Sequence, residues 1–199
     1  MLGEEDGYLK FESGIAHLLF KEFVDVVTLS DSNAPRYIFF HSLVTHSPTT
    51  LNADCSIVNK AEQKAVTKRP ALARVEFIKC GLGHFSALLE KLRELGVYDK
   101  TLIILSSDHG SSYPDRALNY KPFLERGVDR SMLGRASATM AIKPFGATGP
   151  LKTSQAPVSL LDIPQTILAA NGLSENNPDN AAGARDVFSV NPMEKRERE

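Results

Sequence analysis

An acidic residue and a histidine stand side by side where an apolar run ends. Residues 102–105 are all apolar, two serines follow, and then come Asp108, His109 and Gly110. A carboxylate oxygen and an imidazole nitrogen are ligands that suit a divalent cation such as zinc or manganese. Neighbouring residues of a regular strand face opposite ways, so both can reach one ion only if the backbone turns. A glycine at position 110 would permit that turn.

The alternative interpretation of this pair is structural. Asp108 would then cap a turn, and His109 would be a hydrogen-bonded surface residue. An isolated Asp-His-Gly sequence does not separate the two interpretations. Its position directly after a strand-like apolar run favours the metal site.

Two more histidines follow a second apolar run. Residues 37–40 are apolar, His41 comes directly after them, and His46 stands in the loop beyond. Imidazole can donate a hydrogen bond to a sulfate or phosphate oxygen, or protonate a leaving group. We interpret His46 as a catalytic candidate and His41 as a substrate contact or a structural residue. Arg135 and Lys143 flank a third, weaker apolar run and could each hold an anionic substrate or face solvent.

Three segments have apolar residues at helical spacing and should position these side chains. They are residues 12–27, 70–95 and 158–172. The helix over 70–95 has the clearest pattern, and Gly96 is expected to end it. Its predicted buried face consists of Ile78, Leu82, Phe85, Leu89 and Leu92.

Two continuous apolar runs are typical of strands that are buried on both faces. They are Tyr37–Phe40 and Thr101–Leu105, and Ala136–Pro144 is a weaker third strand. Such strands, separated by helices, predict an α/β fold with a largely parallel sheet covered by helices. The first two strands should be parallel neighbours or near-neighbours, with the helix over 70–95 on one face. Ligands of such sheets bind at the carboxyl ends of the strands, where the histidine and aspartate candidates lie.

Composition indicates an ordinary globular domain. The 199 residues are 42% hydrophobic and 24% charged, with a net charge of -1, which provides no general attraction to nucleic acid or to an anionic membrane. No apolar run approaches the roughly 20 residues of a membrane helix. The first residues are acidic and polar, unlike a signal peptide.

The remaining ligand-type residues are not expected to take part in chemistry. His17 and His84 lie within predicted helices, where no catalytic role is expected. Cys55 and Cys80 are the only cysteines, too few for a disulfide framework. Two free thiols are the favoured interpretation, and a single bridge in an oxidising compartment stays open.

Three blocks of the chain resemble the sulfatases and their relatives in the alkaline phosphatase superfamily. Residues 83–110 read GHFSALLEKLRELGVYDKTLIILSSDHG, which looks like the family's long helix and the buried strand ending in a metal-binding Asp-His before glycine. Residues 39–55, FFHSLVTHSPTTLNADC, are similar to its strand and His-x-Pro loop. Residues 134–173 resemble its later strand and helix. The resemblance spans roughly residues 36–187 and is greatest to membrane-tethered sulfatase-like hydrolases whose catalytic domain faces the periplasm.

The resemblance implies a site as well as a fold. The fold would be alkaline-phosphatase-like, and Asp108 and His109 would bind a divalent metal ion, which could be calcium, manganese or zinc. His46 would contact the substrate or its leaving group, and His41 and Arg135 would contact a sulfate or phosphate ester. Nucleic acid is not expected as a partner, and the oligomeric state stays open.

One departure from the family pattern changes these expectations. The family's nucleophile is a cysteine in a Cys-x-Pro-x-Arg-like motif, or a threonine or serine in the transferases, and neither lies at the expected place upstream of Tyr37. Cys55 and Cys80 do not fit that motif. We therefore expect residues 1–188 to be a sulfatase-like domain incomplete at its amino side, with a polar, disordered tail at 189–199.

The missing nucleophile leaves three functions open. The leading one is metal-dependent hydrolysis of sulfuric esters, with the isolated chain inactive. The others are a phosphoethanolamine- or phosphoglycerol-type transferase and a non-catalytic metal- or anion-binding remnant. Any membrane contact would run through the amino-side portion, on the periplasmic side.

Overall fold

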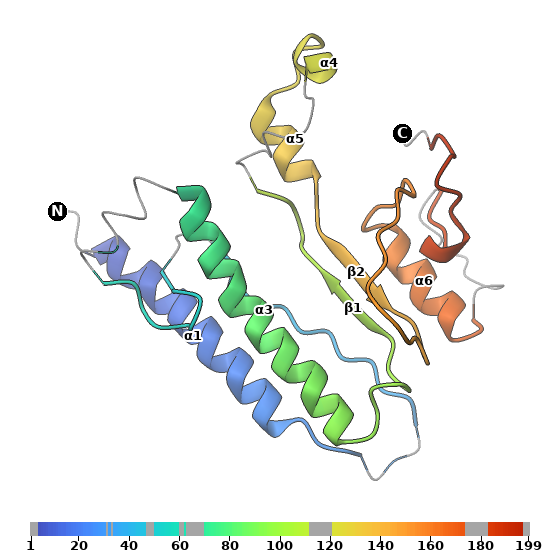
Figure 1. Ribbon diagram of the computed structural model, residues 1–199, viewed down its shortest axis with the longest axis horizontal. Coiled ribbons are helices and arrows are strands. Elements are labelled where there is room, and N and C mark those ends of the chain that lie inside the picture. Colours follow the sequence, from blue (N-terminus) through green and yellow to red (C-terminus); the bar gives the residue numbers. More distant parts are fainter. Residues whose placement is uncertain are drawn as a thin grey trace. The chain divides into compact units, whose positions relative to one another are not determined.

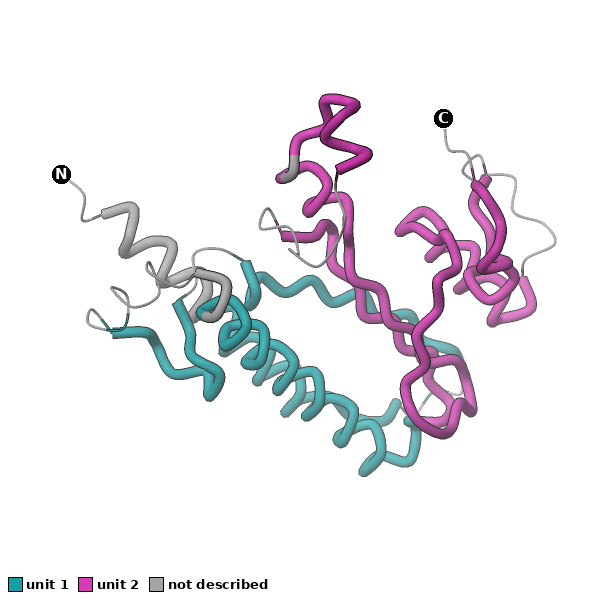
Figure 2. The backbone as a smooth tube through the Cα atoms, turned by 45° about the horizontal axis from the view of Figure 1, so that its top comes forward, with its two compact units in different colours: residues 1–98 teal, residues 99–199 magenta. Residues whose placement is uncertain are grey.

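The computed structural model describes residues 4–30, 32, 34–46, 50–59, 62, 70–111, 121–173 and 183–196 (Figure 1). The chain divides into two compact units, residues 1–98 and residues 99–199 (Figure 2). The first unit is helical, and the second contains a small sheet with short helices. Each unit is described by itself.

Two long helices form the frame of the first unit. They are α1, Glu4–Val26, and α3, Pro70–Glu94, which lie side by side (Figure 1). The predicted helix over 70–95 is thus confirmed, and that over 12–27 begins earlier. Gly96 has a φ of 69°, as its predicted helix-ending role requires.

The face that α3 buries is only partly the predicted one, since Phe85 packs against the core but two other predicted residues are exposed. Phe77 and Cys80 are 1% and 0% exposed, whereas Ile78 and Leu82 are 40% and 50% exposed. The physical reason is contact with a loop as well as with α1. A side chain at Gly81 would lie 2.8 Å from Cγ2 of Thr45, so the glycine faces that loop at close range. The core of this unit consists of Ala16, Phe20, Val24, Val44, Leu51, Phe77 and Cys80.

The segment Tyr37–Phe40 is not the buried strand that we predicted. It belongs to no strand, and Tyr37 and Phe39 are 73% and 75% exposed. Only Phe40 packs, with its ring stacked on Phe23 at a centroid distance of 4.5 Å and tilted against Phe20 at 4.9 Å. An apolar run favours burial, but it does not determine which segment covers it. Here the ring contacts with α1 take the place of strand pairing.

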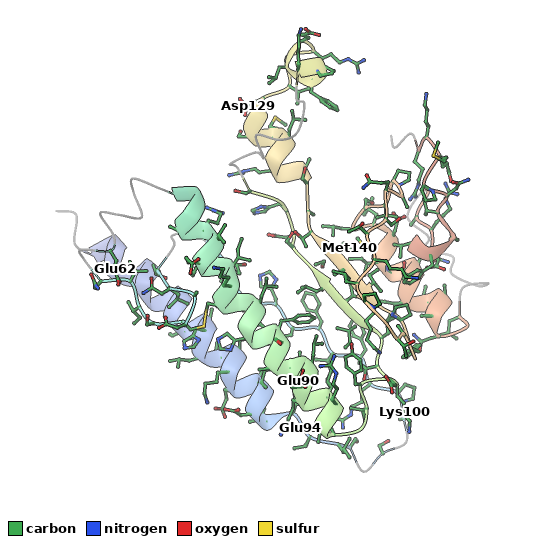
Figure 3. The ribbon with its side chains drawn as sticks, in the orientation of Figure 1. Glu62, Glu90, Glu94, Lys100, Asp129 and Met140 are labelled. Atoms are coloured by element: carbon green, nitrogen blue, oxygen red, sulfur yellow. A yellow bond between two sulfur atoms is a disulfide. The ribbon has the colours of Figure 1, made fainter. Side chains whose placement is uncertain are left out.

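The two cysteines are joined, which overturns the favoured interpretation of free thiols. A disulfide links Cys55 to Cys80, visible as the yellow bond in Figure 3. Cys55 has a positive φ of 64° in a turn that is closed by the bridge between Leu51 and Ile57. The turn packs on α3, and that long-range contact brings the sulfurs together.

The sheet of the second unit has two antiparallel strands. They are β1, Ile103–Ser106, and β2, Met140–Lys143, paired from Ile103 with Lys143 to Ser106 with Met140. The two predicted strands therefore exist, but the largely parallel sheet is not seen among the described residues. The chain reverses between them through α4, Lys121–Leu124, and α5, Arg130–Ala136, so the returning strand runs antiparallel (Figure 1).

The rest of the second unit is built around one buried carboxylate. α6, Asp162–Ala170, replaces the longer helix predicted over 158–172, and the short helix η2 covers Val187–Ser189. Asp162 is fully buried and forms an ion pair with Arg196 at 2.9 Å. The tail predicted at 189–199 thus includes a guanidinium that is only 5% exposed.

Candidate functional site

The Asp-His pair lies directly after the carboxyl end of β1. The amide of His109 donates to Oδ1 of Asp108 at 2.8 Å, and His109 Nε2 lies 3.7 Å from Asp108 Oδ2. Adjacent side chains of a regular strand would diverge, so the turn at the strand end brings these two together. Both are open to solvent, with 73% of Asp108 and 55% of His109 exposed.

The orientation of the His109 ring is set by a neighbouring carbonyl. Nδ1 lies 2.7 Å from the carbonyl oxygen of Gly110. A carbonyl oxygen can only accept, so Nδ1 carries the hydrogen. The other ring nitrogen, Nε2, is then free of hydrogen in the neutral ring and faces the Asp108 carboxylate. A backbone contact of this kind orients many metal-binding histidines.

Gly110 is required for space rather than for a turn. Its amide donates to the carbonyl oxygen of Arg135 at 2.7 Å. A Cβ at this position would lie 2.1 Å from the Gly134 oxygen and 2.4 Å from the Ser137 oxygen. Its φ is not in the left-handed region, so glycine is not needed here for the backbone turn that we predicted. The close approach fixes the Asp-His loop to the end of α5.

The structure brings Arg135 to the same end of the sheet as the pair. Ser107 continues the ladder, with its amide 3.1 Å from the Thr139 oxygen and its hydroxyl accepting from the Thr139 amide at 2.9 Å. Residues 107–110 therefore run beside residues 135–139. The side chain of Arg135 is exposed there.

Asp129, labelled in Figure 3, caps the start of α5 by accepting from the Ser131 amide at 2.7 Å.

Lys143 does not join this end of the sheet. It pairs with Ile103 at the start of β1, and its ammonium donates to the Thr101 oxygen at 2.8 Å. Burial lowers the pKa of Lys143, and the charge of Asp99 works against that shift. Lys143 and Arg135 therefore lie at opposite ends of the sheet, and an anion contact of Lys143 stays a prediction.

His41 and His46 belong to the first unit. Both are exposed, and the amide of His46 donates to the Leu43 oxygen at 2.9 Å in a tight turn. The ring of His41 lies 6.5 Å from that of Phe39. Their approach to Asp108 would join two units, so it stays a prediction.

A family comparison decides what this arrangement belongs to. The model of the sulfatase family matches residues 4–173 of the chain. The chain belongs to the sulfatase family. The match runs across both units of the structure. No curated protein and no solved structure matches the chain.

Membership gives the sulfatase domain its broad character. The family implies an alkaline-phosphatase-like α/β fold and a hydrolase-type domain that acts on sulfate esters, and its members are usually metal-dependent. The described residues form helices and a two-stranded antiparallel sheet, and the parallel sheet of such a fold is not seen among them. None of their helices has the length and apolarity to cross a bilayer.

Sequence reasoning missed a second group of ligand-type residues in this sulfatase domain. His17 Nδ1 lies 2.7 Å from His84 Nε2, and the Cys55 sulfur lies 3.4 Å from the same nitrogen. Cys80 completes the group through the disulfide. Burial, with smaller contributions from His17 and Lys21, lowers the pKa of His84.

Part of this second group was visible in the sequence. Cys80 and His84 are four residues apart and share one face of α3. Nothing in the sequence pairs them with His17 or Cys55, which arrive from α1 and from the turn at 50–58. His17 and His84 do lie in helices, as predicted, but a position in a helix does not prevent a histidine from joining a group of ligand-type residues.

Proposed function

We propose that this sulfatase-family chain binds a divalent cation through Asp108 and His109 and uses it to hold a sulfate or phosphate ester. The observation that carries the proposal is the position of the pair. An oxygen of the Asp108 carboxylate and Nε2 of His109 lie 3.7 Å apart, open to solvent, just past the end of β1. The Asp108 carboxylate suits calcium and manganese and the His109 imidazole suits zinc, so the pair by itself does not select the metal.

The residues around the pair suggest how an ester would be held. A bound cation would neutralise charge on the ester oxygens. Arg135, tethered through its backbone to Gly110, would donate hydrogen bonds to the same anion. His41 would contact the substrate and His46 would protonate the leaving group.

A second candidate function rests on the cysteines. Both are consumed by the Cys55–Cys80 disulfide, and no cysteine is free to serve as a nucleophile. This favours cation and anion binding without turnover for the chain by itself. A hydroxyl nucleophile, as in the related transferases, is the remaining route, and Thr45 and Ser107 are the residues to examine. The disulfide also supports an oxidising compartment, consistent with the periplasmic side of a membrane.

Calorimetric titration of the oxidised chain with manganese, calcium and zinc tests cation binding. Oxidation keeps the cysteine thiolates out of the measurement. We expect weak binding, since two protein ligands are fewer than the about four of a closed site. It should disappear in Asp108→Ala and in His109→Ala. Asp25→Ala removes an equally exposed carboxylate, paired with Lys21 on α1, and should leave binding intact. Binding that survives both site substitutions would contradict the proposal.

Assays with an aryl sulfate and an aryl phosphate separate the two candidate functions. Loss of a nucleophile removes the covalent step itself, so negligible turnover with intact cation binding supports the binding function. Turnover that is lost in Asp108→Ala supports the hydrolase. Ser107→Ala and Thr45→Val would then show which hydroxyl takes part.

A further inference from the structure

The second group of ligand-type residues has the composition of a metal site in which the disulfide occupies both thiols. We infer that His17, Cys55, Cys80 and His84 bind one zinc-type divalent cation when the two cysteines are reduced. Each offers one ligand atom, and the four atoms all lie within 4.8 Å of one another. The inference does not depend on the proposed function, because the residues and the unit are different.

The chemistry of the four ligands is selective. Two thiolates and two imidazoles form one of the common ligand sets of structural zinc, and they exclude calcium and magnesium, which prefer oxygen. Two thiolates also balance the charge of a divalent cation, so the filled site would be neutral. Cys80 is fully buried and the other three residues are half-buried, which suits a closed site.

The geometry needs only a small rearrangement. Zinc bonds of about 2.3 Å to sulfur and about 2.0 Å to nitrogen place neighbouring tetrahedral ligands roughly 3.3 to 3.8 Å apart. The Cys55 sulfur already lies 3.4 Å from His84 Nε2. The two ring nitrogens, now 2.7 Å apart, would separate slightly, and the sulfurs would part when their bond is broken. Cys55 can move because it lies in a turn, whereas α1 and α3 hold the other three.

A two-electron redox step converts the disulfide-bonded chain into the reduced chain that can bind the metal. A phosphine takes an oxygen atom from water and gives two electrons to the disulfide, which becomes two thiols. On binding the cation, the thiols release two protons to solvent. An oxidising thiol–disulfide partner reverses the change, rebuilds the Cys55–Cys80 bond and releases the metal.

Cobalt titration of the full chain tests the site. The probe is cobalt(II), added to metal-free chain before and after reduction with a phosphine, because thiolate-to-cobalt charge transfer and tetrahedral visible bands report the ligands. The reduced chain should bind one equivalent with both signatures, and zinc should displace it. The oxidised chain should give neither signature. Absence of thiolate bands in the reduced chain would overturn the inference.

Variants separate four ligands from two thiols alone. His17→Gln and His84→Gln should each weaken cobalt affinity at least about a hundredfold, since even outer-shell partners of a metal contribute about 10- to 100-fold. Asp25→Ala, which removes an exposed carboxylate of the same unit that is paired with Lys21, should have no effect. Thiolate bands that persist at full affinity in both Gln variants would reduce the site to chelation by two thiols and refute it.

A folding readout covers the case in which reduction melts the unit. Helical circular dichroism lost on reduction should then return when zinc is added, because metal binding and folding are coupled. Zinc that fails to restore the signal would count against the site. The same measurement on Cys80→Ser should show no zinc effect.

Discussion

The amide of Gly110 donates a hydrogen bond to the carbonyl oxygen of Arg135, with 2.7 Å between the two atoms. This bond joins the loop that carries Asp108 and His109 to the end of α5. Because it uses only backbone atoms, it fixes the loop without restricting the Arg135 side chain. The proposed cation ligands and the proposed anion contact therefore share one support.

The close packing at Gly110 predicts a local and measurable weakness. In Gly110→Ala the new methyl would overlap the Gly134 and Ser137 oxygens, which are backbone atoms and cannot swing aside. We expect the free energy of unfolding to fall by about 1–3 kcal/mol, as for an overpacked core, and manganese binding to weaken with it. Urea denaturation and calorimetry measure the two effects.

Gly83→Ala is the matched control for that substitution. Gly83 lies in α3, and a Cβ there would have nothing within 4 Å. Helix propensity then predicts a gain of up to about 1 kcal/mol in the free energy of unfolding. Equal destabilisation by both substitutions would mean that steric overlap at Gly110 is not the cause.

Arg135 should affect anion affinity without affecting cation affinity. We expect Arg135→Ala to weaken sulfate binding to the manganese-loaded chain about tenfold, through loss of charge-assisted hydrogen bonds. Arg126→Ala, which removes another exposed guanidinium of the same unit, should leave it unchanged. Sulfate titration by calorimetry at fixed ionic strength makes the comparison. Equal losses in both variants would indicate a general charge effect.

The buried pair of Asp162 and Arg196 should be essential to the second unit. Asp162 also accepts from the amides of Ser159 at 2.8 Å and Arg185 at 2.9 Å. Asp162→Ala leaves the Arg196 guanidinium buried without its counter-charge, which typically costs about 3–5 kcal/mol. Denaturation of Asp162→Ala, Arg196→Met and the double variant gives the coupling energy.

The outcome of that cycle distinguishes a pair from two separate contacts. The double variant should be less destabilised than the sum of the single ones, because neither charge is then left alone. Strict additivity would show that Asp162 acts through the two amides and not through Arg196. The exposed pair of Lys21 and Asp25 provides a control in which single and double alanine variants should change little.

The disulfide should contribute to the stability of the first unit. It closes a loop between positions 25 residues apart, and chain entropy then predicts a contribution of about 3.5 kcal/mol. Denaturation of the metal-free Cys55→Ser, Cys80→Ser double variant against the oxidised chain should show this loss. A difference below about 1 kcal/mol would mean that the packing of α1 on α3 holds the turn without the covalent link.

Local features of this protein could be predicted from the sequence because they depend on near neighbours. The periodicity of residues 70–95 gave α3 almost to the residue, and Gly96 ends it through a backbone conformation that glycine allows. The apolar run before Asp108 gave β1 within two residues. The carboxylate and the imidazole are adjacent in the chain, so their proximity required only a turn.

Features that depend on distant segments were decided by the tertiary structure alone. The composition of an apolar run does not show whether its neighbouring strand is parallel or antiparallel, so the antiparallel pairing of β1 with β2 could not be predicted. A helix with apolar residues on several faces buries whichever one its neighbours cover, and the contact of Val44 and Thr45 with Gly81 selected the face of Cys80. The orientation of α3 that buries this face also brings Cys80 and His84 close to Cys55 and His17. Side chains far apart in sequence meet only once the packing of the helices is fixed.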